Sequence, residues 1–121
     1  MEVQAAFAVL RQCLVVTLLG ETDALAIGRL QSVVLTRVAS DRVRGVVFDA
    51  SAVTVLDSFD IDALVRTLAM CRLLGARGVV VGLSVPVVAA LMTLDAPIDG
   101  LEAEATVEAA LKRLLSERNA A

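Results

Sequence analysis

Short runs of β-branched residues alternate along this chain with longer stretches in which apolar residues recur every three or four positions. The runs 13–19, 45–49 and 79–83 are typical of strands, and the first is apolar enough to be covered on both faces. The stretches between them carry two helical stripes: Ile27, Leu30, Val34 and Val38, then Ile61, Leu64, Leu68 and Cys71. This alternation predicts an α/β fold in which helices cover a mixed β-sheet.

The ends of these segments carry start and stop signals. Residues that can cap a helix precede four predicted helices: Thr22, Asp57 or Ser58, Ser84 and Thr106. Gly75 supplies a stop for the second helix, and Pro86 falls in the first turn of the third, where its missing N–H costs least. Further strands are expected over 3–9 and, weakly, at the sheet edge over 101–104. We therefore predict a single domain over residues 1–121 with about four α-helices.

The composition limits both the core and the partners. Of the 121 residues, 58% are apolar and only 2% are aromatic, so the core is expected to be aliphatic. The same scarcity of aromatic side chains leaves no stacking surface for single-stranded nucleic acid. A net charge of −3 argues against binding to DNA or to an anionic membrane surface.

Neither a transmembrane helix nor a secretory signal is expected. The longest uncharged stretch, 78–94, is interrupted by glycine, serine and proline and is shorter than the about 20 apolar residues that span a bilayer. Arg11 precedes any long apolar run. Cys13 and Cys71 belong to no Cys-x-x-Cys motif and are expected to be reduced, buried thiols. We therefore expect a cytoplasmic protein.

The residues that most enzymes use are missing. The chain has no histidine, which excludes Ser-His-Asp and Cys-His catalysis and histidine metal sites. Its only lysine, Lys112, follows a leucine, so a phosphate-binding loop that ends in Gly-Lys is absent. These gaps argue against an enzyme, and neither a cofactor nor a metal is expected.

One segment gathers polar side chains between a buried strand and a helix. In residues 48–62, three carboxylates surround Ser58: Asp57, Asp60 and Asp62. They could cap the helix and favour the positive end of its dipole, or they could hold Mg²⁺ weakly. Alternatively, Ser58 could be a phosphorylation switch, because its hydroxyl lies at a helix start.

The same segment resembles the STAS domains, the fold of the anti-sigma-factor antagonists. The resemblance lies in the strand that ends at Asp49 and in the sequence Val55-Leu56-Asp57-Ser58 at the helix start. It continues through residues 73–76 and the short helix around Pro86, and so covers essentially the whole chain. The common antagonist pattern reads Asp-Ser-Ser-Gly, whereas Asp57-Ser58-Phe59 looks like the small scaffold antagonist of the stressosome.

This resemblance implies a non-enzymatic scaffold and antagonist that sequesters a serine/threonine switch kinase until Ser58 is phosphorylated. Asp57 and Phe59 would contact partners, while Asp60 and Asp62 lie outside the matched motif. The implied partners are the kinase, a larger co-scaffold that contains a related domain, and a phosphatase, in homo- and hetero-oligomers. One alternative is a simple soluble antagonist that binds an anti-sigma kinase without a large assembly. Another, from a different class, is a small hydrolase that uses the carboxylates around Ser58.

Overall fold

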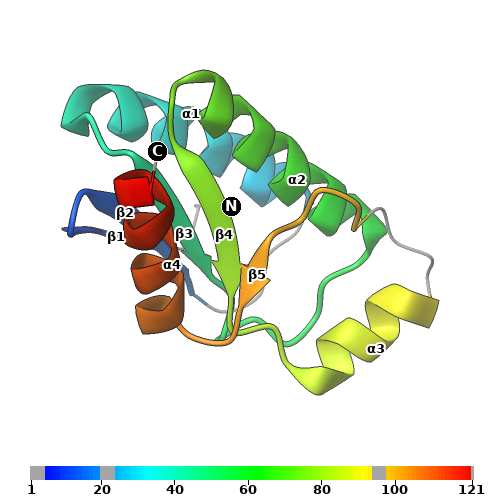
Figure 1. The fold of residues 1–121 in the computed structure, drawn as a ribbon. Helices are drawn as coiled ribbons and strands as arrows, with labels where there is room; N and C mark the ends of the chain where they lie inside the picture. The colour runs from blue at the N-terminus through cyan, green and yellow to red at the C-terminus, as the bar shows by residue number, and fades with distance from the viewer. Residues whose placement is uncertain (1–4, 20–23, 94–97, 121) are drawn as a thin grey trace.

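A five-stranded sheet in the order β1-β2-β3-β4-β5 forms the centre of the molecule (Figure 1). The computed structural model describes residues 5–19, 24–93 and 98–120. The strands are β1 (Ala5–Leu10), β2 (Cys13–Leu18), β3 (Gly45–Asp49), β4 (Arg77–Val81) and β5 (Ala103–Glu104). Only the β1–β2 pair is antiparallel, and the other three pairs are parallel. The predicted mixed sheet is therefore confirmed.

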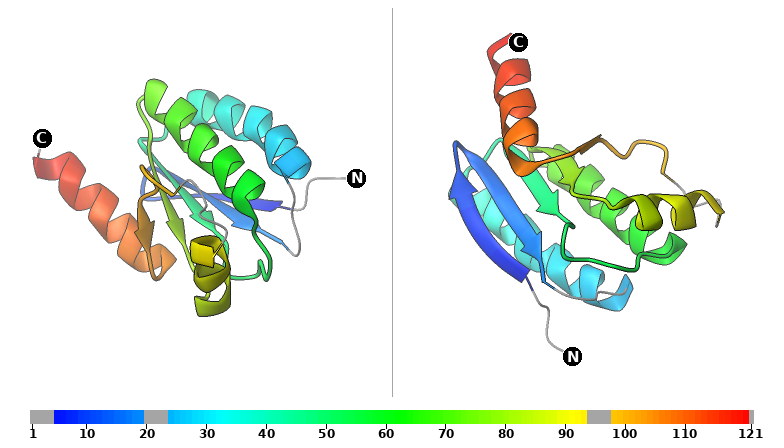
Figure 2. Two further views of the ribbon diagram at one scale, coloured as in Figure 1. Left: turned by 90° about the vertical axis from the view of Figure 1, so that its right-hand side faces the viewer. Right: turned by 90° about the horizontal axis from the view of Figure 1, so that it is seen from below.

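Helices cover both faces of this sheet, as the predicted α/β fold requires. They are α1 (Ala24–Asp41), α2 (Ser58–Leu73), α3 (Val85–Thr93) and α4 (Val107–Ala120). Helices α1 and α2 lie side by side on one face, and α4 lies on the other (Figure 2). The short α3 follows β4 and packs Val87 and Leu91 against the core on the α1–α2 side.

The core has two layers because successive side chains of a strand point to opposite faces. Leu14, Val46 and Phe48 face α1 and α2, and they meet the two predicted helical stripes, every member of which is buried. On the other face, the residues packed together are Cys13, Val15, Val47, Val79, Val81, Ala110, Leu111 and Leu114. Burial on both sides accounts for the apolar sequences of β2 and β3.

The structure corrects the predicted bounds of four strands. β1 ends at Leu10, one residue later than predicted, and β2 ends at Leu18, one residue earlier. β4 begins at Arg77 and ends at Val81, two residues earlier than the predicted 79–83, because its five residues pair in register with β3. Gly82 then adopts a positive φ of 79°, which ends the strand. β5 contains only Ala103 and Glu104, not the whole of 101–104. The predicted cap Thr22 lies outside the described residues.

Other predictions from the sequence are confirmed. Both Cys13 and Cys71 are buried free thiols, and burial raises the pKa of the Cys71 thiol to about 11. Within the uncharged stretch, residues 78–81 belong to β4 and residues 85–93 form α3. In the parts of the chain that the structure describes, no helix combines the length and apolar character needed to span a bilayer.

Candidate functional site

The loop between β3 and α2 crosses the carboxyl end of the parallel strands, where α/β proteins usually present their functional groups. Two hydrogen bonds fix its first turn. The Ala50 N–H donates to the Val81 carbonyl over 2.9 Å, and the Val53 N–H donates to the Ala50 carbonyl over 3.0 Å. Farther along, Val53 and Leu56 bury their side chains in the core. The loop therefore delivers the start of α2 to a fixed place.

Asp49, the last residue of β3, fixes the same end of the loop by further hydrogen bonds. Its Oδ1 atom accepts hydrogen bonds from Ser51 N at 3.0 Å and from Ser51 Oγ at 2.7 Å. The Ser51 backbone also packs directly on Gly82, where an added Cβ would lie 2.9 Å from Ser51 N. A glycine after β4 is thus part of the support for the loop that precedes Ser58.

Two aspartates fix the first turn of α2 by a reciprocal pair of hydrogen bonds. Asp57 is the N-cap, and its Oδ1 atom accepts from the Asp60 N–H over 2.9 Å. The Asp60 carboxylate in turn accepts from the Asp57 N–H over 2.9 Å, which completes a capping box. Asp60 is only 4% exposed. Asp60, which lies outside the matched motif, therefore belongs to the support of the helix start.

Asp62 has a different environment from Asp60. Its carboxylate forms an exposed ion pair with Arg66, one turn farther along α2, at 3.0 Å. Exposed pairs of this spacing contribute only about 0.3–0.5 kcal/mol. In the described ranges there is no group of three or more Asp, Glu, Cys or His side chains that could hold a metal ion. Of the three carboxylates around Ser58, Asp57 and Asp60 thus cap the helix, whereas Asp62 forms an ion pair on its surface.

The outer surface of the same helix start combines a hydroxyl, a carboxylate and an exposed ring. Ser58 is the first residue of α2 and is half-buried, whereas Asp57 is exposed. Phe59 is 74% exposed and Val55 is 62% exposed, which is unusual for large apolar side chains. The structure therefore brings together the predicted residues Asp57, Ser58 and Phe59 on an accessible surface.

The capping assignment can be tested with two aspartates of the same helix. Asp57→Ala should lower the free energy of unfolding by about 1 kcal/mol, because it removes the N-cap acceptor. Asp57→Asn should recover most of this loss, since asparagine also caps well. Asp62→Ala serves as the control and should cost less than about 0.5 kcal/mol. Urea denaturation of the four proteins measures these values, and equal losses at both positions would contradict the assignment.

The comparison with family models identifies one family. The model of the STAS domain matches residues 4–110 of this chain. A search of curated proteins finds no match. The S58E variant of RsbS from Moorella thermoacetica is 21% identical, with a TM-score of 0.77, and the match covers 95% of this chain and 97% of RsbS.

Two further solved structures share the fold. One is a chain in the molecular architecture of the stressosome, described as a signal integration and transduction hub. It is 19% identical, with a TM-score of 0.72, and the match covers 93% of this chain and 98% of that one. The other is the anti-sigma factor antagonist SpoIIAA in its unphosphorylated form. It is 18% identical, with a TM-score of 0.65, and the match covers 92% of this chain and 97% of that one. SpoIIAA from Bacillus has also been solved in its phosphorylated form.

Proposed function

Because this chain belongs to the STAS domain family, we propose that it is a non-enzymatic antagonist whose partner binding is switched by phosphorylation of Ser58. The observation that carries the proposal is the accessible serine at the first position of α2, between the exposed Asp57 and the exposed ring of Phe59. Such a surface suits a protein partner, which would bury the ring and approach the hydroxyl. SpoIIAA, which shares the fold, exists in unphosphorylated and phosphorylated forms.

The electrostatics of the helix start suit a switch. Phosphorylation would add a charge of about −1.5 to −2 at pH 7. The new charge would arise beside Asp57 and within three residues of Asp60, whose carboxylates already occupy the start of the helix. A partner surface that fits the neutral hydroxyl and the Phe59 ring would then face a dianion. A mismatch of this kind at an interface costs several kcal/mol, which is enough to release the partner.

We propose that the partner is a serine/threonine kinase and that the chain works within a stressosome-type scaffold. The Asp57-Ser58-Phe59 sequence and the fold shared with RsbS and a stressosome chain support this version. A larger STAS-containing co-scaffold would be the assembly partner, and a phosphatase would reset Ser58. The fold shared with SpoIIAA supports the alternative of a simple anti-sigma factor antagonist. Particle size after mixing with the co-scaffold separates the two versions, because only the scaffold enters a large assembly.

A hydrolase that uses the same carboxylates has less support. Asp57 and Asp60 both accept hydrogen bonds from the helix backbone, and Asp62 pairs with Arg66. A general base must instead reach the proton that it removes.

Incubation with the cognate kinase and ATP, followed by measurement of the intact mass, tests the proposal. Wild type should gain one phosphate, and Ser58→Ala should gain none. Thr54→Ala is the control, because it removes an exposed hydroxyl of the same loop and should leave the modification unchanged. Calorimetry should then show that the phosphoprotein binds the kinase at least about tenfold more weakly than wild type. Ser58→Asp should show part of this loss, since a carboxylate carries less charge than a phosphate.

Two results would contradict this model. One is stoichiometric phosphorylation of Ser58→Ala, for example at Ser51 or Thr54. The other is equal kinase affinity for wild type, Ser58→Asp and the phosphoprotein. Thermal melts of each variant accompany the binding data, because a collapse of folding in Ser58→Asp would make the serine a structural residue.

A further inference from the structure

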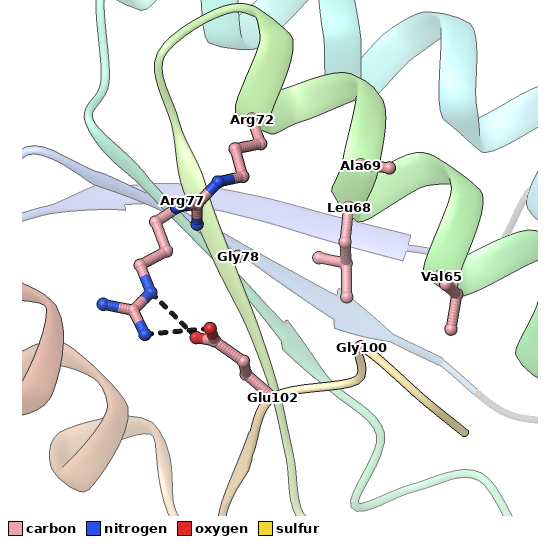
Figure 3. Close-up of a pocket in the computed structure, with 8 residues that line it drawn as sticks. All are labelled: Val65, Leu68, Ala69, Arg72, Arg77, Gly78, Gly100 and Glu102. Atoms are coloured by element: carbon pink, nitrogen blue, oxygen red, sulfur yellow. Dashed lines mark hydrogen bonds and ion pairs between the residues drawn. The ribbon is translucent and has the colours of Figure 1, made fainter.

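A cavity of about 210 Å³ lies beneath the second half of α2 (Figure 3). Its walls come from α2, from the first residues of β4 and from the segment that leads into β5. It begins at Val65, two helical turns beyond Ser58, and it contains none of the residues that form the helix start. This cavity is therefore separate from the surface assigned to the partner kinase.

Most of the cavity wall is apolar and is shaped by two glycines. Val65, Leu68 and Ala69 line it from the side of α2 (Figure 3). Leu68 packs directly on β4, where a Cβ on Gly78 would overlap its Cδ2 methyl group. Gly100 lies across from the helix, and a Cβ there would meet nothing within 4 Å. Gly78 thus lets Leu68 lie close to β4, and Gly100 leaves the side across from the helix open, which gives room for the body of a small apolar molecule.

The other end of the cavity is charged. The Arg77 guanidinium donates two hydrogen bonds, each of 2.8 Å, to the Glu102 carboxylate. Arg113 lies 3.8 Å from Glu102 and 3.0 Å from Glu104. By contrast, the Arg72 side chain forms no hydrogen bond or ion pair within the described ranges. Among the described residues that line the cavity, two arginines, Arg72 and Arg77, face one glutamate, Glu102, so this lining carries one positive charge in excess.

The position of Arg72 places this excess charge within reach of a ligand. Figure 3 shows its side chain extending from α2 toward the Arg77–Glu102 pair. The bonded Arg77 guanidinium holds the pKa of Glu102 below its usual range, and the charges of Arg113 and Arg72 add to this effect. Glu102 is thus already neutralised by its own partners, whereas no side chain in the described part of the chain occupies the donors of the Arg72 guanidinium.

We propose that this cavity binds a small organic acid, with its apolar body against α2 and its carboxylate accepting hydrogen bonds from Arg72. An apolar pocket with one well-placed charged group is the usual form of a small-molecule site. Arginine matches a carboxylate with two parallel hydrogen bonds. A volume of about 210 Å³ equals about seven waters at roughly 30 Å³ each, which suits an acid of roughly ten non-hydrogen atoms.

Octanoate, an acid of this size, is the probe, and the full chain is titrated by NMR and calorimetry. Saturable binding is expected, with the largest shifts at the amides of Val65, Ala69 and Gly78. Arg72→Gln should weaken binding at least about tenfold, because it removes a hydrogen-bonded charge. Arg66→Gln is the matched control on the same helix, since Arg66 already pairs with Asp62 away from the cavity, and it should bind as wild type.

Two further measurements separate the apolar and the charged contributions to octanoate binding. The neutral analogue 1-octanol should bind at least about tenfold more weakly than octanoate, because it cannot form the charged pair. Ala69→Leu, which keeps every charge but fills the cavity, should abolish octanoate binding. Ser58→Ala should bind octanoate as wild type, so this test and the kinase test fail independently. Absence of saturation, full affinity in Arg72→Gln, or shifts that map to α3 instead would overturn the proposal.

Discussion

Replacing Phe48 with alanine is expected to lower the free energy of unfolding by about 3–5 kcal/mol. Phe48 is 0% exposed, and it lies in the central strand with Val16 and Val80 as its two cross-strand neighbours. It is the only aromatic residue that is fully buried in the described core, so its ring fills a space between aliphatic side chains. A domain of this size is stable by about 5–15 kcal/mol, and the loss would therefore be a large part of the total.

Phe59→Ala is the matched control, because the same atoms are removed from a side chain that is 74% exposed. Its free energy of unfolding should stay within about 0.5 kcal/mol of wild type. If Phe59 contacts the kinase as proposed, the same variant should weaken that complex. Urea denaturation and calorimetry measure the two effects. A loss below about 1 kcal/mol in Phe48→Ala would show that the aliphatic core can collapse around the missing ring.

Gly82→Ala is expected to lower the free energy of unfolding by about 2–4 kcal/mol. Two costs combine at this position. The backbone has a φ of 79°, which strains any residue with a Cβ. The new Cβ would also lie 2.9 Å from Ser51 N and 3.0 Å from Ser51 Cα, and these backbone atoms are held by Asp49. The loop that leads to Ser58 must therefore move.

Two other glycines separate these costs. Gly75 has a φ of 89° but nothing within 4 Å of an added Cβ, so Gly75→Ala measures the backbone strain alone, about 1 kcal/mol. Gly28→Ala, in the interior of α1 and free of contacts, should stabilise the protein by about 0.5–1 kcal/mol. Chemical denaturation ranks the three variants. If Gly82→Ala costs no more than Gly75→Ala, the loop does not depend on the contact with Ser51.

The elements that the sequence predicted well are those whose signals are local. The stripe from Ile61 to Cys71 has a helical period, and the stop at Gly75 follows it directly, so both ends of α2 could be placed. The bounds of β4 could not be predicted, because the apolar run 79–83 does not show which residues pair with a neighbouring strand. Register with β3 extends the strand back to Arg77, and the left-handed backbone at Gly82 ends it.

The candidate site likewise combines features that local sequence signals predict with contacts that they do not. Asp57 and Ser58 are neighbours in sequence, so their place at a helix start follows from capping alone. The burial of Asp60 had a signal as well, since an acidic residue three positions after an N-cap matches the capping-box spacing. No local sequence signal predicted the packing of Ser51 on Gly82 or the pairing of Arg77 with Glu102. Both depend on which strands become neighbours, and residues 25 or more apart in sequence meet there only in the folded sheet.

The reciprocal bonds between Asp57 and Asp60 have a consequence for any enzyme that modifies Ser58. They hold the serine in helical geometry, with buried side chains on both sides in sequence at Leu56 and Asp60. A peptide cut from this region would lose that support, because a helix of this length is marginal in water on its own. If Ser58 is the phosphorylated residue, as proposed, its kinase would recognise a folded surface and not a linear consensus sequence, and only molecules that have already folded would be modified.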